Sequence, residues 1–161
     1  MPKEHDRKTN AMRVLDAAGA RYRARFFECP EALSGVEVAR LLELDEDRVF
    51  KTLVTAGKSG EHFAFMVPVA CELDLKKAAE AVGEKSIAMV KARELLPLTG
   101  YVHGGCSPIG MKKQFVTVLD ESCLPLDTIV FSAGKIGMQI EMDPRALIDF
   151  IGARTAAITA G

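Results

Sequence analysis

Two runs of β-branched and aromatic residues, 49–55 and 62–69, flank a turn that contains Gly57 and Gly60. Such runs, bounded by glycine, are typical of strands, and two of them this close together predict a β-hairpin. A hairpin alone is only marginally stable in water, so further strands or helices must cover it. The hairpin therefore constrains the fold more than any other feature of the chain.

Short helices and strands are predicted around this hairpin in an irregular order. Side-chain caps followed by apolar residues at helical spacing indicate the helices. We expect helices to begin near residues 10, 34, 74 and 144 and to end near Gly19, Leu44, Gly83 and Gly152, with one helical turn at 93–96 before Pro97. Further strands are expected at residues 22–27, 85–89, 114–120, 128–132 and 138–142. Because this order does not alternate regularly, we predict a mixed α+β fold with a curled or closed sheet, not a doubly wound parallel sheet.

Length and composition fit one globular domain. The chain has 161 residues, 48% of them hydrophobic, and domains commonly have about 100–150 residues. We expect a single domain over residues 1–161, with 1–8 and 153–161 as peripheral tails. No run approaches the roughly 20 apolar residues of a membrane helix, and the charged first residues do not resemble a secretory signal. We therefore expect a cytoplasmic protein that does not bind membranes.

Charge and cysteine content restrict the possible partners and cofactors. The net charge of −1 means that nucleic-acid binding would depend on a local basic patch. The four cysteines and three histidines do not have the spacing of a metal site. We therefore expect no metal and no cofactor, and we interpret Cys29, Cys71 and Cys123 as free thiols without a chemical role.

Residues 99–113, Thr-Gly-Tyr-Val-His-Gly-Gly-Cys-Ser-Pro-Ile-Gly-Met-Lys-Lys, contain four glycines and a proline. Glycine lets a ligand approach the main chain, and the amide groups of such a loop can hold a carbonyl oxygen or an oxyanion. The alternative is a glycine-rich connection between two strands, and the spacing leaves both interpretations open. His103 could act as a general base here, although a lone histidine is more often a polar surface residue.

Lys51 and the glycine turn after Ser132 are the other candidate positions. Lys51 shares one strand face with Val49 and Leu53, where a charge is costly unless it lines a pocket or lies at a sheet edge. Ser132 and Lys135 could contact a phosphate or a terminal ribose, or they could belong to a plain β-turn. The sequence contains neither a nucleophile elbow nor a Walker-type phosphate loop.

Four segments, in this order, resemble the YbaK/EbsC family of free-standing aminoacyl-tRNA deacylases, which is related to the editing insertion of bacterial prolyl-tRNA synthetase. They are Val-Phe-Lys-Thr-Leu-Val from Val49, Glu-Leu-Asp-Leu-Lys-Lys-Ala from Glu72, the loop 99–113, and Ser-Ala-Gly-Lys-Ile-Gly from Ser132. The resemblance covers residues 9–151, nearly the whole chain. It implies a barrel-like mixed sheet of about six to seven strands, flanked by short helices.

The resemblance also implies a reaction, the removal of a wrong amino acid from tRNA. In this branch the substrate is chiefly cysteine on proline tRNA, and its own thiol is thought to attack the ester and leave a cyclic thioester. The enzyme then only has to position the ester and stabilise its carbonyl oxygen. The alternatives are a deacylase for another small amino acid such as alanine, and a non-catalytic module that binds tRNA or a synthetase. A thiol-binding protein has only Cys106 in its favour.

By the same resemblance, three residues act on the ester. Lys51 holds the substrate or its terminal phosphate and ribose, the Gly104 amide meets the carbonyl oxygen, and Ser132 hydrogen-bonds the amino group or the ribose. Further substrate contacts are expected from Phe27, Gly105, Cys106, Pro108, Lys135 and Gln139, with Cys106 a neighbour of the substrate and not a nucleophile. Lysines expected to contact tRNA phosphates are Lys76, Lys77, Lys112, Lys113 and Lys135.

Weak tRNA binding is expected from so small a basic patch, and prolyl-tRNA synthetase is the candidate partner that would add selectivity. Three positions depart from residues found in at least some relatives. Phe27 replaces a tyrosine, Ile136 an arginine, and Gln139 an acidic residue. These changes keep the reaction class but leave the preferred amino acid open, since packing alone rarely rejects a side chain similar in size to cysteine.

Overall fold

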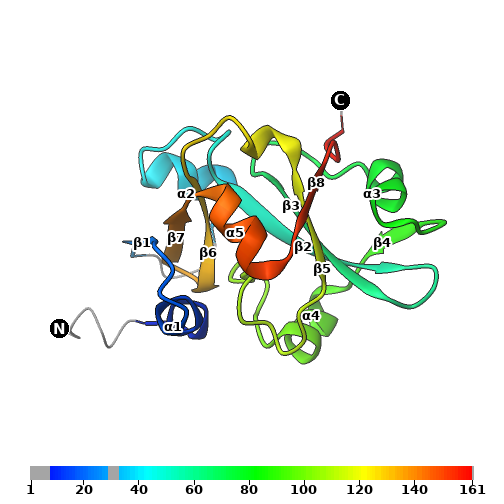
Figure 1. Ribbon diagram of the computed structural model, residues 1–161, viewed down its shortest axis with the longest axis horizontal. Helices are drawn as coiled ribbons and strands as arrows, with labels where there is room; N and C mark the ends of the chain where they lie inside the picture. The colour runs from blue at the N-terminus through cyan, green and yellow to red at the C-terminus, as the bar shows by residue number, and fades with distance from the viewer. Residues whose placement is uncertain (1–7, 29–32, 161) are drawn as a thin grey trace.

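The computed structural model describes residues 8–28 and 33–160 of the chain. Within them, helices and strands follow one another irregularly and form two sheets with helices packed around them (Figure 1). The elements are α1 (Asn10–Ala17), β1 (Arg23–Phe26), α2 (Gly35–Leu41), β2 (Phe50–Gly57), β3 (His62–Pro68), α3 (Leu75–Val82), β4 (Ile87–Met89), α4 (Ala92–Thr99), β5 (Val116–Asp120), the 3-10 turn η2 (Glu121–Cys123), β6 (Ile129–Lys135), β7 (Met138–Met142), α5 (Pro144–Ile151) and β8 (Arg154–Ala156). No helix in this part of the chain is long and apolar enough to cross a bilayer.

The strands form two open sheets, and the predicted mixed α+β class is confirmed. The larger sheet has the order β4-β2-β3-β5-β8, and the smaller has the order β1-β7-β6. They meet where Val49, just before β2, forms a parallel bridge with Val130 of β6. In Figure 1 the smaller sheet lies at one end of the molecule, and β4 and α3 lie at the other. The expected barrel is not closed, because β2 and β6 are bridged only at this point before they diverge.

The predicted hairpin is confirmed as the antiparallel pair β2–β3, in which Lys51 is opposite Val67. Both of its faces are covered, which explains why it can be so apolar. On one face, Phe65 and Val67 pack with Ala78 and Ala79 of α3. On the other face, Phe50 and Met66 join the largest core cluster, together with Leu147 of α5.

The predicted helix starts are confirmed by side-chain caps that accept hydrogen bonds from the first free amide groups. Thr9 Oγ1 accepts from the Met12 amide at 3.2 Å, and Ser34 forms the predicted capping box with Glu37. Asp74 caps α3 and Asp143 caps α5. Both of these helices end at a glycine with positive φ, Gly83 and Gly152, as predicted.

The sequence pattern was wrong about α4, which does not stop before Pro97. The helix runs from Ala92 to Thr99 and contains Pro97 in its second turn. Thr99 closes the helix by donating its hydroxyl proton to the Leu95 carbonyl at 2.8 Å, and the Gly100 amide donates to Leu96. A proline removes one amide donor, and here burial of Leu95 and Thr99, together with the Lys112 amide that donates to the Thr99 carbonyl at 3.0 Å, outweighs that loss.

The sequence pattern also missed β8, in the segment that we expected to be a peripheral tail. Arg154–Ala156 pairs in parallel with the end of β5. Ile158, two residues after the strand, is fully buried, and its amide donates to Asp120 Oδ1 at 3.0 Å. Three residues are too few to show the alternation of apolar and polar side chains that predicts a strand. Only the pairing with β5 therefore identifies β8. At the other end of the chain, residues 1–7 lie outside the described residues.

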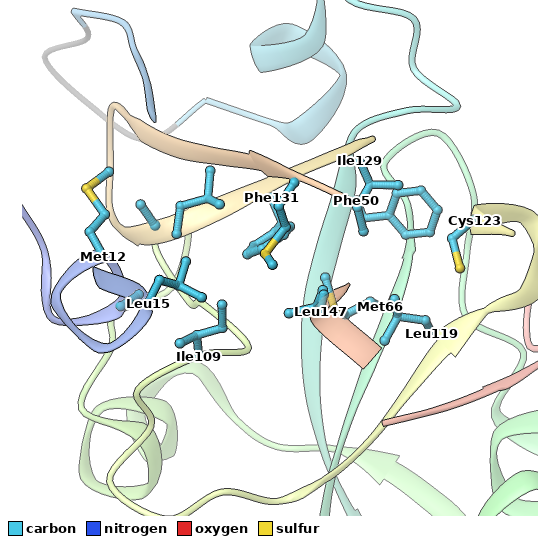
Figure 2. Packing of buried hydrophobic residues seen from close by; sticks show 14 residues of the cluster. Met12, Leu15, Phe50, Met66, Ile109, Leu119, Cys123, Ile129, Phe131 and Leu147 are labelled. Atoms are coloured by element: carbon cyan, nitrogen blue, oxygen red, sulfur yellow. The ribbon is translucent and has the colours of Figure 1, made fainter. Parts of the chain in front are cut away.

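The largest core cluster lies between the smaller sheet, α1, α5 and the near face of the hairpin (Figure 2). Phe131 of β6 lies between Leu15 of α1 on one side and Phe50 on the other (Figure 2). Ile109, from the glycine-rich loop, lies beside Leu15 and is buried with it. The loop is therefore anchored in the core, and this anchoring positions the candidate site.

Candidate active site

A cavity of about 340 Å³ opens where β2, β6, the glycine-rich loop and the starts of α2 and α4 come together. Its volume is at the lower end of the roughly 300–1,000 Å³ typical of ligand pockets. The residues that line it include Ser34, Lys51, Thr52, Val54, Lys91, Leu95, His103, Gly104, Cys106, Ser132 and Gln139. Five of the predicted substrate-site residues are therefore brought to one cavity from three distant parts of the sequence: Lys51, Gly104, Cys106, Ser132 and Gln139.

The strand β2 carries Lys51 into this cavity. Lys51 is half-buried and pairs with Val67, one pair from the end of the β2–β3 ladder that is away from the hairpin tip. The sequence left two alternatives for Lys51, a residue that lines a pocket and a residue at a strand edge. In the structure Lys51 is both. Lys51 lines the cavity because the second edge of β2 is open at this point.

The glycine-rich loop is buried along most of its length. Tyr101 and residues 105–109 are buried, and the Tyr101 hydroxyl donates to the Ile109 carbonyl. The Asn10 side chain donates to the Gly110 carbonyl at 3.1 Å, which connects the loop to α1. A flexible connection would not have these contacts, so the loop presents a fixed wall to the cavity.

Gly104 is the exposed point of that wall. The turn from Val102 to Gly105 is closed by the Gly105 amide, which donates to the Val102 carbonyl at 3.0 Å. Gly104, the third residue of the turn, has φ +87°, which the third position of a type II turn requires and which glycine adopts without strain. The hydrogen bond that closes the turn does not use the Gly104 amide. This amide is therefore a candidate donor for a ligand in the cavity.

Ser132 of β6 also lines the cavity, just before the turn to β7. The pairing shifts register between Ser132 and Lys135, and the Gly134 amide donates to Ser132 Oγ at 3.1 Å. Since that oxygen already accepts a hydrogen bond, the Ser132 hydroxyl proton remains available to a ligand. A Cβ atom on Gly134 would lie 2.6 Å from the Tyr101 ring, so the turn packs tightly against the glycine-rich loop.

Cys106 lines the cavity as a buried thiol. Burial raises its pKa to about 12, so the thiol is protonated at neutral pH. A nucleophilic cysteine needs a thiolate, which its surroundings usually favour by lowering the pKa. Cys123 is also buried and Cys71 is half-buried, both free thiols, whereas Cys29 lies outside the described residues. His103 is exposed at the cavity mouth.

Four predicted substrate contacts lie outside the cavity lining. Phe27 is next to the β6–β7 turn, where its amide donates to the Gly137 carbonyl at 2.9 Å. Gly105 and Pro108 are buried behind the cavity wall, and Lys135 is exposed at the turn. A Cβ atom on Gly105 would lie 3.3 Å from the Ile136 amide nitrogen. These residues shape the wall from behind rather than line it.

The lysines predicted to contact tRNA also lie outside the cavity lining. Besides Lys135, the other four are exposed: Lys76 and Lys77 on α3, and Lys112 and Lys113 at the end of the glycine-rich loop. The Lys77 ammonium donates to the Thr159 carbonyl at 2.9 Å. Sequence reasoning missed Lys91, an exposed lysine at the start of α4 that does line the cavity. Nothing in the sequence distinguishes Lys91 from other surface lysines.

Sequence reasoning also missed Thr52 and the apolar wall formed by Val54 of β2 and Leu95 of α4, both of which are buried. The residue next to Lys51 is an ordinary strand threonine by sequence, and only the pairing of β2 places it on the cavity. Within residues 8–28 and 33–160, no group of three or more His, Cys, Asp or Glu side chains is arranged to hold a metal ion.

Comparison with solved structures supports the fold. A crystal structure provisionally described as a trans-editing enzyme for prolyl-tRNA synthetase has a TM-score of 0.85 at 23% sequence identity and covers 100% of both chains. The crystal structure of a hypothetical protein, APE2540, has a TM-score of 0.86 at 25% identity and covers 94% of this chain and 100% of that one.

Comparison with known sequences gives the family. EbsC of Enterococcus faecalis, provisionally named a Cys-tRNA(Pro)/Cys-tRNA(Cys) deacylase, is 44% identical over 158 residues, which are 98% of this chain and 96% of EbsC. A proline–tRNA ligase of Pelobacter propionicus is 31% identical over 109 residues, which are 68% of this chain and 19% of the ligase. The profile of the aminoacyl-tRNA editing domain matches residues 29–150. The chain therefore belongs to the aminoacyl-tRNA editing domain family.

Proposed function

We propose that this protein is a free-standing aminoacyl-tRNA deacylase that removes cysteine from mischarged proline tRNA. The observation that carries the proposal is the convergence of Lys51, Gly104 and Ser132 on one small cavity. The identity to EbsC supports cysteine as the amino acid that is removed. We further propose that the whole chain acts as one domain, and that it acts in the cytoplasm, where tRNA is charged.

The three residues have complementary chemical abilities. The Gly104 amide donates to the carbonyl oxygen of the ester and stabilises the negative charge that develops there. The Ser132 hydroxyl, whose oxygen accepts from the Gly134 amide, donates its proton to a ribose oxygen. Lys51 attracts the terminal phosphate and holds the end of the tRNA in place.

The reaction uses the thiol of the substrate. The cysteine sulfur attacks the carbonyl carbon of its own ester, so that a carbon–sulfur bond forms and the carbon–oxygen bond to the ribose breaks. The thiol proton is lost and the ribose oxygen gains one, which leaves free tRNA and a cyclic thioester. The protein contributes position and charge stabilisation, not a nucleophile. Cys106 then serves as part of the wall, in agreement with its buried, protonated thiol.

Exposed lysines are available to contact the body of the tRNA. Lys91 extends the positive charge of Lys51 along the cavity, and it joins the exposed lysines of α3 and of residues 112–113 as a candidate phosphate contact. Isolated surface lysines give weak, salt-sensitive binding. We therefore propose prolyl-tRNA synthetase as the partner that presents the mischarged tRNA.

A deacylation panel tests the proposal. Cysteinyl-, alanyl- and prolyl-tRNA(Pro) are each incubated with the full chain, with and without prolyl-tRNA synthetase, and the remaining ester is measured over time. We expect the cysteinyl ester to be cleaved fastest. Preferential cleavage of the alanyl ester would replace cysteine by alanine in the proposal. Binding of tRNA without cleavage of any ester would show a non-catalytic module instead.

A further inference from the structure

The second edge of β2 has a gap at Thr52. Along its first edge, β2 pairs continuously with β3. On the second edge, β6 bridges at Val49 and β4 pairs with Thr55–Gly57, and the Val90 amide donates to the Val54 carbonyl. In the described part of the chain, no strand pairs with residues 51–53 on this edge, and the cavity lies there.

The backbone of Thr52 faces this gap. Consecutive strand residues direct their N–H and C=O groups to opposite edges. The Val49 carbonyl accepts from the Val69 amide on the β3 side, whereas the Val54 carbonyl accepts from the Val90 amide on the other side. Thr52 is in phase with Val54, so its N–H and C=O groups point toward the open edge. Its side chain lies on the face opposite to that of Lys51.

Besides the open strand edge, the Thr52 hydroxyl is a second, independent indication that a ligand binds here. Among residues 8–28 and 33–160, Thr52 Oγ1 is the one buried side-chain nitrogen or oxygen atom without a hydrogen-bond partner. Other buried threonines are satisfied, since Thr55 Oγ1 donates to the Phe63 carbonyl and Thr117 Oγ1 to the Phe115 carbonyl. Buried polar groups are nearly always paired in native proteins, so this hydroxyl is expected to bind something that enters the cavity.

We infer that Thr52 binds the amino-acid part of the substrate as if that part were one residue of a missing strand. The inference rests on the proposed deacylase function. The α-ammonium group donates to the Thr52 carbonyl and to Thr52 Oγ1, and the ester carbonyl oxygen accepts from the Thr52 amide. Two residues opposite each other in an antiparallel pair exchange hydrogen bonds in this way. The Thr52 amide thereby becomes a second donor to the oxygen that meets Gly104, as an oxyanion hole requires.

This arrangement divides the cavity chemically. An ammonium group has only donors, so it needs acceptors, and the Ser132 hydroxyl is better placed to donate. Thr52 supplies those acceptors on the face away from the Lys51 side chain, which limits repulsion between the two positive charges. Lys51 is left for the phosphate and ribose end of the substrate.

The test compares Thr52→Val with Thr52→Ser on two esters of the same tRNA. One ester is cysteinyl, and the other is 3-mercaptopropionyl, which has the thiol and lacks the amino group. We expect Thr52→Val to slow cleavage of the cysteinyl ester by about 10-fold, the loss typical of one hydrogen bond to a charged group. Thr52→Ser should retain most of the activity, and all three proteins should cleave the 3-mercaptopropionyl ester at similar rates. Equal slowing of both esters by Thr52→Val, or no slowing of either, would overturn the inference.

Stability and binding measurements separate a ligand-binding role from a structural one. Without substrate, Thr52→Val should have an unchanged or higher Tm, because it replaces an unpaired hydroxyl by a methyl group of similar shape. A clearly lower Tm would show that the hydroxyl has a structural partner and would overturn the inference. Adenosine carrying cysteine through a 3′-amide cannot be cleaved, and we expect it to bind Thr52→Val about 10-fold more weakly than wild type. If wild type bound this compound in a Thr52-dependent way but cleaved no ester, the proposed function would fail while the inference stood.

Discussion

Two glycine-containing turns look alike in sequence and differ in the structure. The hairpin tip, residues 57–60, joins β2 to β3, and the buried loop, residues 104–110, forms a wall of the cavity. Gly60 has positive φ and no atom within 4 Å of where a Cβ would lie. Gly110 also has positive φ, but a Cβ there would lie 2.8 Å from Asn10 Nδ2. Gly60 in the tip serves the turn alone, whereas Gly110 in the buried loop also serves packing.

Glycine content therefore does not distinguish a simple turn between strands from a loop that lines a ligand cavity. What differs is the set of contacts made by the intervening residues. In the tip, Ser59 bonds to the half-buried Glu84. In the buried loop, Ile109 packs in the core, and its carbonyl accepts from the Tyr101 hydroxyl. The four predictions below test this difference, from the largest expected effect to the smallest.

Thiol reactivity should show the largest effect. The pKa of about 12 for Cys106 means that its thiolate population at pH 8 is on the order of 1,000-fold lower than that of a thiol with the ordinary value. We expect iodoacetamide to modify Cys71 well before Cys106, as measured by peptide mass spectrometry over time. Unfolding in urea should make the two rates similar. Rapid native modification of Cys106 would contradict the fixed, buried loop.

A lysine that lines the cavity and a lysine at the hairpin tip allow a matched comparison of activity. Lys51→Ala should lower kcat/KM for cysteinyl-tRNA(Pro) by about 100-fold, roughly 3 kcal/mol, because it removes a charged contact to the substrate. Lys58→Ala, at the exposed hairpin tip, should leave kcat/KM unchanged. Equal activity of the two variants would remove Lys51 from the site.

Matched glycine substitutions should separate packing from turn geometry. Gly110→Ala should destabilise the protein by about 2–3 kcal/mol, through its positive φ and the displacement of the Asn10 and Tyr101 side chains that bond to the loop. Gly60→Ala should cost only about 1 kcal/mol, from the backbone conformation alone. Urea unfolding gives both values, and equal costs would show that the buried loop is no more constrained than the tip.

The smallest effect is expected for the Ser59–Glu84 contact at the tip. The Ser59 hydroxyl and amide hold the pKa of Glu84 below its ordinary value. A carboxyl whose pKa is lowered by folding adds stability above the ordinary pKa, and this stability is lost as pH falls through the folded value. Ser59→Ala removes the hydroxyl and keeps the amide, so the Glu84 pKa should rise part of the way toward its ordinary value in an NMR titration, and deacylation should be unchanged. An unchanged Glu84 pKa would show that the hydroxyl does not lower it.

The sequence by itself determined the local elements. Caps such as Ser34 and Asp74, stop glycines such as Gly83, and the hairpin were predicted because each depends on residues close together in the chain. The resemblance to a family also indicated Lys51, Gly104 and Ser132 before any geometry was known. These signals are local or motif-based, which is why they can be read from one sequence.

Only the tertiary structure decided the rest. The strand β8 exists because β5 offers it an edge, and α4 passes Pro97 because its last turn is buried and its Thr99 carbonyl accepts from the Lys112 amide. Thr52 became a candidate only when the second edge of β2 proved to be open beside it. Pairing, burial and gaps in a sheet depend on residues far apart in the chain, so local sequence patterns do not contain them.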